Sequence, residues 1–270
     1  MQTDNGPAVD LTNCDREPIH LLGAVQPFGL LAVSSTTWCV TRASRNVVEW
    51  LGVEGADLLG RPLDQIFTGD AVHTIRGQLQ SAIMGDTIAR AFGVVLTGAG
   101  LRCDVALHVV HDTVVIEGEP CVDDPAINAG ATVRGMIARL QQTDELRTFY
   151  RVAAREMRAV TGFDRVMIYR FDHDGSGEVI AESARAGLES YLGLHYPASD
   201  IPRQARILYE RNWLRIIPDV NAKPAAIEPQ LDREGQVLDL SMSILRSVSP
   251  IHVEYLQNMG VAAHVGVHFA

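Results

Sequence analysis

The sequence lacks the hydrophobic runs and targeting segments that would place a protein in a membrane or outside the cell. No stretch approaches the roughly 18 uninterrupted apolar residues of a transmembrane helix. Residues 1–6 have neither the positive nor the apolar region of a signal peptide. Of the 270 residues, 47% are hydrophobic and 21% are charged. We therefore expect a globular, cytoplasmic protein folded as one large or two ordinary domains.

Cysteine is scarce and widely spaced. The absence of any CxxC pair speaks against a structural zinc site, and a reducing compartment speaks against disulfides. Cys14 differs from the other cysteines because Arg16 is nearby, and a neighbouring cation favours the nucleophilic thiolate. An exposed, unreactive thiol is the alternative for this position. The remaining three are interpreted as small packing residues: Cys39, Cys103 and Cys121.

Signatures of catalysis and of charged partners are also missing. The sequence has no phosphate-binding glycine loop, no GxSxG elbow and no helical spacing of metal ligands. Residues 172–177 imitate the start of a calcium loop, but Ser183 stands where such loops carry glutamate, which favours a plain hairpin turn. The net charge of −10 argues against broad binding to nucleic acid or anionic membranes. We expect no enzyme active site and no metal, nucleic-acid or membrane partner.

The first half of the chain has the pattern of a small α+β domain. Val72, Ile75 and Leu79 are spaced for one face of a long helix, and Ser44 is a candidate N-cap for a short one. Turn residues separate the remaining apolar runs, which alternate as strands do. The predicted strands cover residues 29–33, 38–41, 87–96, 101–110 and 113–117, and the predicted helices cover 45–51, 56–59 and 70–84.

The second half begins after a proline- and acid-rich break at residues 119–125. An amphipathic stripe follows over residues 133–140 and continues to Gly162. It is compatible both with helices that cover their own domain and with helices that pair with a second subunit. Strands are predicted at residues 165–171, 178–182 and 261–269, and a long loop at 218–240.

Residues 194–206 form a bent approach to a helix. A proline favours extended geometry in the residue before it, so Tyr196 should be extended. Pro202 suits the first position of a helix because its φ is fixed and it has no N–H to satisfy. Asp200 is held at the bend, and Ile201 lies between these two residues. On physical grounds alone, a plain loop-to-helix junction is an equally good interpretation.

Four long stretches, spread over most of the chain, resemble bacteriophytochromes. Residues 196–206 resemble the chromophore-pocket signature of phytochromes, with its aspartate-isoleucine-proline turn. Residues 13–20, followed by Gln26-Pro27, resemble the N-terminal segment that carries the bilin-linking cysteine. Residues 245–260 resemble the stretch that supplies a pocket histidine and a propionate-binding arginine, and residues 162–171 match as well.

This resemblance implies a PAS domain followed by a GAF domain, each with a central antiparallel sheet and flanking helices. The N-terminal arm should then pass through the GAF region. In the family, the GAF sheet continues with further strands and a closing helix, so we expect the second domain to be C-terminally incomplete here. The predicted limits are 1–22 for the arm, 23–120 for the PAS domain, 121–142 for a linker helix and 143–270 for the GAF domain.

The resemblance also implies a covalently bound biliverdin, attached by a thioether to Cys14. Arg215 and Arg246 correspond to the propionate-binding arginines, with Ser249 and Tyr209 as further hydrogen-bonding partners. The backbone carbonyl of Asp200 would accept from the pyrrole N–H groups, helped by His252. The positions that match the remaining pocket residues are Tyr169, Tyr196, Ile201, Pro202 and Tyr255.

The expected function is a red/far-red photoreceptor module that isomerises its bilin and signals to output domains outside this chain. A homodimer through the helices, downstream phytochrome-specific domains and a histidine-kinase parent protein are implied in the same way. The alternative is a PAS–GAF sensor of another small ligand, such as a cyclic nucleotide. The asparagine-lysine-phenylalanine-aspartate-glutamate series of cyclic-nucleotide GAF domains is missing, which counts against this alternative.

Overall fold

The computed structural model describes residues 17–85, 88–121 and 129–268. The chain divides into two compact units, one drawn from Met1–Val122 and Gln204–Ala270 and the other from Asp123–Arg203. Both combine helices with antiparallel sheets, so the predicted α+β class is confirmed. The first unit takes residues from both ends of the chain, so these units do not test the predicted domain limits, which stay predictions. Cys14 lies outside the described residues.

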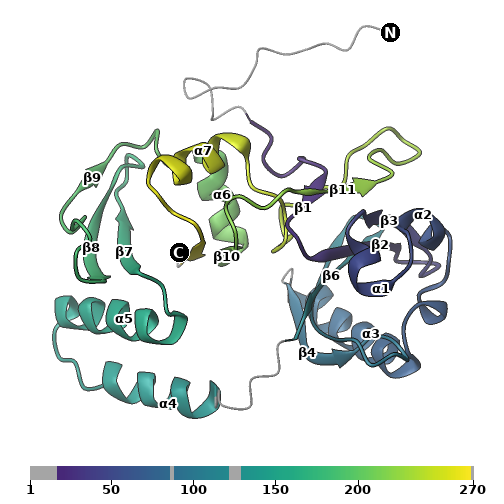
Figure 1. The fold of residues 1–270 in the computed structure, drawn as a ribbon, viewed down its shortest axis with the longest axis horizontal. Coiled ribbons are helices and arrows are strands. Elements are labelled where there is room, and N and C mark those ends of the chain that lie inside the picture. Colours follow the sequence, from purple (N-terminus) through teal and green to yellow (C-terminus); the bar gives the residue numbers. More distant parts are fainter. Residues whose placement is uncertain (1–16, 86–87, 122–128, 269–270) are drawn as a thin grey trace, which may run out of the picture. The chain divides into compact units, whose positions relative to one another are not determined.

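The first unit is built on a seven-stranded antiparallel sheet with the order β1-β11-β3-β2-β6-β5-β4. Figure 1 shows β11, drawn in yellow-green, beside the purple β1, although the two are about 200 residues apart in the sequence. The strands are β1 (Ala24–Val25), β2 (Gly29–Ser34), β3 (Val40–Ser44), β4 (Ala89–Val95), β5 (Arg102–Val110), β6 (Thr113–Pro120) and β11 (Ala225–Glu228).

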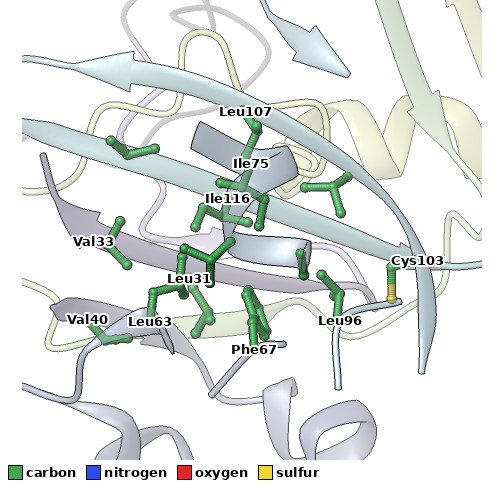
Figure 2. Close-up of a cluster of buried hydrophobic side chains, with 14 of the residues drawn as sticks. Leu31, Val33, Val40, Leu63, Phe67, Ile75, Leu96, Cys103, Leu107 and Ile116 are labelled. Atoms are coloured by element: carbon green, nitrogen blue, oxygen red, sulfur yellow. The ribbon is translucent and has the colours of Figure 1, made fainter. Parts of the chain in front are cut away.

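Both faces of this sheet are buried, which explains the unbroken apolar run in β2. Successive strand residues point to opposite faces. Leu31 and Val33 therefore belong to one cluster, shown in Figure 2, while Leu30 and Ala32 belong to another. The first cluster lies against α3 (Gly69–Gly85), where the predicted face of Ile75 and its neighbours is buried. The second cluster is closed by residues from the C-terminal part of the chain, among them Ile227, Leu238, Leu240 and Leu245.

The remaining elements of the first unit are short. A two-stranded antiparallel sheet pairs β10 (Leu214–Ile217) with β12 (His264–Val267). The helices are α1 (Val47–Leu51), α2 (Gly55–Leu58), η2 (Leu63–Gln65), α6 (Arg203–Arg211) and α7 (Pro250–Asn258). As predicted, α6 begins directly after Pro202.

Two local predictions in this unit were wrong, and one strand was missed. The hydroxyl of Ser44 does not cap α1 but accepts a hydrogen bond from the Leu30 N–H at 2.9 Å. The predicted loop at residues 218–240 contains β11, whose partners Ala43 and Ser44 lie about 180 residues earlier. Strand β10 was not predicted, because four residues are too short a run to show a period.

In the second unit one helix packs against a three-stranded sheet of order β7-β8-β9, and a second helix packs on the first. Gly162, at φ 71°, ends α5 in the left-handed conformation that glycine adopts without strain. The backbone N–H of Asp172 bonds the Ser176 carbonyl at 2.8 Å, so the calcium-like stretch is the predicted hairpin turn. The elements are α4 (Ala129–Leu140), α5 (Leu146–Thr161), β7 (Arg165–Phe171), β8 (Gly177–Ala184) and β9 (His195–Tyr196).

Within the described ranges, no helix is both long enough and apolar enough to span a bilayer. Among the same residues, no group of three or more histidine, cysteine, aspartate or glutamate side chains is arranged to hold a metal ion.

Candidate ligand-binding site

Two buried arginines form the centre of the candidate site in the first unit. Arg215 lies on β10 with 9% of its surface exposed, and Arg246 follows a buried turn with 7% exposed. The Arg215 guanidinium donates to the carbonyls of Ile244 at 3.2 Å and Ser247 at 3.0 Å. The Arg246 guanidinium donates to the Leu240 carbonyl at 3.5 Å. Backbone carbonyls therefore hold both cations in place.

Within the part of the chain that the structure describes, these two cations have no counter-charge in contact with them. Among the described residues, neither Arg215 nor Arg246 forms an ion pair. Burial, together with the charge of Arg246, lowers the pKa of Arg215 to about 9, and burial lowers the pKa of Arg246. A buried unpaired charge is costly, and guanidinium forks bind carboxylates and phosphates bidentately. The pair therefore suits a ligand that brings two negative groups.

Residues 24–26 hold the backbone around the two arginines in place. The Gln26 side-chain amide donates to the carbonyls of Ile216 at 2.8 Å and Arg246 at 3.3 Å. Its backbone N–H bonds the Leu245 carbonyl at 2.8 Å, and the Ser247 N–H bonds the Ala24 carbonyl at 3.0 Å. Residues just after the predicted arm thus lie against the segment that carries the arginines.

Aromatic and imidazole rings surround the arginines. The Tyr209 ring on α6 stacks on His268, with 3.6 Å between centroids and 6° between planes. His252 on α7 lies 6.2 Å from Tyr255 and 6.4 Å from His264, measured between ring centroids. Burial lowers the pKa of His252 and of His268 to about 4, and it lowers the pKa of His264. These imidazoles are therefore neutral at pH 7.

The charges of the two arginines influence the pKa values of nearby rings. Burial raises the pKa of Tyr209, while Arg215 and Arg246 oppose that rise. The charge of Arg215 also contributes to the lowered pKa of His252. Ser249, at the start of α7, donates its hydroxyl hydrogen to Glu17 at 2.5 Å. The structure thus brings together the predicted residues Tyr209, Arg215, Arg246 and His252, with Tyr255 beside His252.

The other predicted site residues lie in the second unit. The rings of Tyr169 on β7 and Tyr196 on β9 are 6.2 Å apart between centroids. Burial raises the pKa of Tyr196. Asp200 is half-buried in a turn, and its backbone N–H donates to the Pro197 carbonyl at 3.1 Å. Ile201 and Pro202, which continue this turn toward α6, are half-buried too.

Sequence reasoning missed several residues of the arginine site. Gln26 was noted only as part of a motif, and His264, His268 and Glu117 were not selected. His264 and His268 belong to a run with the pattern of a strand. In such a run, polar residues at alternate positions are normally interpreted as facing solvent. The role of Gln26 depends on partners about 190 and 220 residues away, and no local pattern reveals them.

Comparison with known proteins divides the chain differently from the two compact units. The chain matches the PAS fold over residues 14–121 and the GAF domain over residues 145–267. It is 39% identical over 264 residues to cyanobacterial phytochrome B of Nostoc sp. and 40% identical over 264 residues to the bacteriophytochrome of Pseudomonas aeruginosa. Each alignment covers 96% of this chain but 35% of the relative, so the chain spans about a third of the length of these relatives.

Solved structures agree. The chromophore-binding domain of Stigmatella aurantiaca bacteriophytochrome in the Pr state matches with a TM-score of 0.84 and 42% identity, covering 94% of this chain and 85% of that one. The chromophore-binding domain of an unusual bacteriophytochrome from R. palustris matches with a TM-score of 0.81 and 41% identity, covering 94% and 84%.

A PAS fold, a GAF fold and a buried arginine pair define a PAS–GAF sensory module. The chain belongs to the bacteriophytochrome family. The resemblance drawn from the four sequence stretches is therefore confirmed.

Proposed function

We propose that this chain is the chromophore-binding part of a red/far-red light photoreceptor and that it binds biliverdin through a thioether to Cys14. The observation that carries the proposal is the pair of buried guanidiniums without a counter-charge among the described residues. A linear tetrapyrrole has two propionates, so one ligand supplies both missing charges. The similarity to phytochromes does not favour a cyclic-nucleotide sensor.

The residues of the chain have distinct roles in this proposal. Arg215 and Arg246 bind the propionates, with hydroxyl hydrogen bonds from Ser249 and Tyr209. The neutral imidazole of His252 has one N–H donor and one acceptor nitrogen, which suits the polar edge of a pyrrole system. When bound, the bilin supplies visible absorption and a methine bridge that isomerises in light.

The remaining matched residues have further roles in this proposal. Tyr169 and Tyr196 restrict the ring that rotates, together with the carboxylate of Asp200. The backbone carbonyl of Asp200 accepts from pyrrole N–H groups, and the Ile201-Pro202 step keeps that turn rigid. Tyr255 forms a further wall beside His252.

The wider setting is part of the same proposal. Output then passes to phytochrome-specific and signalling domains, with a histidine kinase as the parent protein and the cytoplasm as its compartment. In this proposal the segment senses light and leaves catalysis to other parts of the protein, which its similarity to phytochromes supports. A homodimer forms through exposed apolar positions of α4 and α5.

The test is to mix the purified chain with biliverdin, record the visible spectrum and stain a denaturing gel with zinc for covalent bilin. We expect a red-shifted band and a fluorescent gel band that is lost in Cys14→Ser. The matched control is Cys39→Ser, which removes another free thiol and should keep the gel band. A red shift without covalent bilin would reject Cys14 as the linker, and no spectral change would contradict the proposal.

A further inference from the structure

A buried carboxylate on the central sheet reaches the segment that carries the arginines. Glu117 lies on β6, between β2 and β5, with 1% of its surface exposed. Its Oε1 accepts hydrogen bonds from the Ser243 hydroxyl and, at 2.7 Å, from the Leu245 N–H. Its Oε2 accepts from the Ile244 N–H at 3.0 Å. Three donors from consecutive residues therefore converge on one carboxylate.

The same short turn holds both guanidiniums. The peptide groups around Ile244 connect the two sides: its N–H donates to Glu117, and its carbonyl accepts from Arg215 at 3.2 Å. Arg246 directly follows Leu245, whose N–H is also bound by the carboxylate. Glu117 thus contacts the segment that holds the arginines through its backbone, without a direct ion pair to either, and its charge also favours the protonated form of both guanidiniums.

The charge of Glu117 is not neutralised by its other neighbour. The Nδ1 atom of His108 lies 3.8 Å from the carboxylate, but burial lowers the pKa of His108 to about 4, so the ring is neutral at pH 7. Burial raises the pKa of Glu117, while the three hydrogen bonds oppose that rise. Each carboxylate oxygen faces a backbone N–H that can only donate, and the Ser243 hydroxyl faces Oε1 as well.

We propose that Glu117 is a positioning residue for the ligand carboxylates: by fixing residues 243–245 it sets the geometry of the Arg215 and Arg246 guanidiniums. The inference rests on the proposed bilin function and deepens it. It makes the arginine pair dependent on a side chain of the PAS sheet more than 90 residues away in sequence. Glu117→Gln keeps the volume of the side chain but places an NH₂ group against a backbone N–H or hydroxyl donor, so one acceptor is lost.

The test compares two ligands that differ only in charge. Biliverdin has two free carboxylates, and its dimethyl ester has none. Affinities are measured by absorbance titration in a Cys14→Ser background, so that binding stays reversible. We expect Glu117→Gln to raise the dissociation constant for biliverdin by about tenfold, the scale of one lost hydrogen bond to a charged group. The constant for the dimethyl ester should change by less than about twofold, because that ligand does not need aligned guanidiniums.

Two further variants make the result specific. Glu119→Gln changes a neighbouring carboxylate of β6 that, among the described residues, makes no hydrogen bond to residues 243–245. It should leave both affinities unchanged. Ser243→Ala removes a donor from the other side of the contact and should show the same charge selectivity with a smaller effect, about threefold. Ser243→Ala decides the question if Glu117→Gln does not fold.

A ligand-free measurement gives an independent readout. Hydrogen exchange of the Ile244 and Leu245 amides in the chain without ligand should speed up in Glu117→Gln and not in Glu119→Gln. Equal loss of affinity for both ligands, or no loss for either, overturns the inference while the proposed function stands. A parent chain that binds neither ligand overturns the proposed function and the inference with it.

Discussion

Several side chains that can carry a positive charge are buried in the first unit. Arg215 and Arg246 are the cationic examples, and His108 is a neutral one whose two ring nitrogens have no hydrogen-bond partner among the described residues. A buried polar group without a partner costs stability that the rest of the fold must supply. A ligand with two negative groups would explain why the arginines are buried. His108 has no such explanation, and its burial makes the stability of the fold sensitive to acid.

We predict that His108→Leu makes the chain less sensitive to acid. The folded pKa of His108 is about 4, below its ordinary value of 6.5, because burial disfavours the charged ring. The unfolded chain therefore binds more protons between these values, and stability falls as pH drops from about 6.5 to about 4. The loss from this residue is up to about 3 kcal/mol. Urea unfolding at pH 7 and pH 4.5 measures it.

The control for this prediction is His73→Leu, which changes an exposed histidine of α3 and should leave the pH dependence unchanged. Leucine is close to histidine in volume and needs no hydrogen bond, so His108→Leu should not lose stability at pH 7. The prediction fails if the variant and the parent lose the same free energy of unfolding on acidification.

At the scale of elements, a pair of glycines makes room for a tryptophan on the central sheet. Gly29 on β2 is paired with Gly118 on β6. A Cβ atom at Gly29 would lie 1.8 Å from the Trp50 ring, and one at Gly118 would lie 3.3 Å from it. The indole of Trp50, a residue of α1, thus covers two adjacent strands where they have no side chains. Glycine is required here for close approach rather than for a special backbone angle.

We predict that Gly29→Ala lowers the free energy of unfolding by about 2 kcal/mol or more, because the indole must move out of a packed position. Gly77→Ala is the matched control: it lies in α3, and a Cβ there meets nothing within 4 Å. That variant should gain about 0.5–1 kcal/mol, since alanine is the better helix former. Urea unfolding at pH 7 compares the two, and a Gly29→Ala chain as stable as the parent would contradict the packing described.

The helix pair of the second unit has an apolar exterior that its own sheet does not cover. Val133 and Ile137 on α4 are 50% and 48% exposed, and Leu146 and Val160 on α5 are 65% and 49% exposed. The two helices are joined by Arg139, whose guanidinium bonds the buried Glu156 carboxylate at 2.7 Å. A rigid helix pair with an exposed apolar stripe is suited to pairing with a second copy.

At the scale of the whole molecule, we predict that the chain is a dimer and that Val133→Glu combined with Ile137→Glu makes it monomeric. Two carboxylates placed in an apolar interface would be buried without partners, which costs more than such an interface gains. Light scattering coupled to size-exclusion chromatography measures the mass. Leu192→Glu, at a 58% exposed position of the same unit outside both helices, is the control and should stay dimeric. A monomeric parent chain would refute the prediction.

Local sequence patterns were enough for most elements and for the family. The spacing of Val72, Ile75 and Leu79 predicted α3, and Gly162 predicted the end of α5. These features depend on residues within a few positions of each other, so the sequence contains them directly. The bacteriophytochrome resemblance was likewise carried by continuous stretches. Arg246 lies in such a stretch, whereas Arg215 lies outside the four stretches and was selected by its correspondence to the family. The ligand roles of both arginines stay predictions.

Only the tertiary structure decided how distant segments combine. It placed β11 beside β1 and β3, and it set Gln26 against Ile216 and Arg246. It also turned Glu117, which reads in the sequence as the polar end of a strand, into a buried acceptor for three donors about 126 residues away. Such contacts depend on which chain segments meet once the apolar surfaces of the sheet are buried. That choice is made by the packing of the whole unit, and no short stretch of sequence records it.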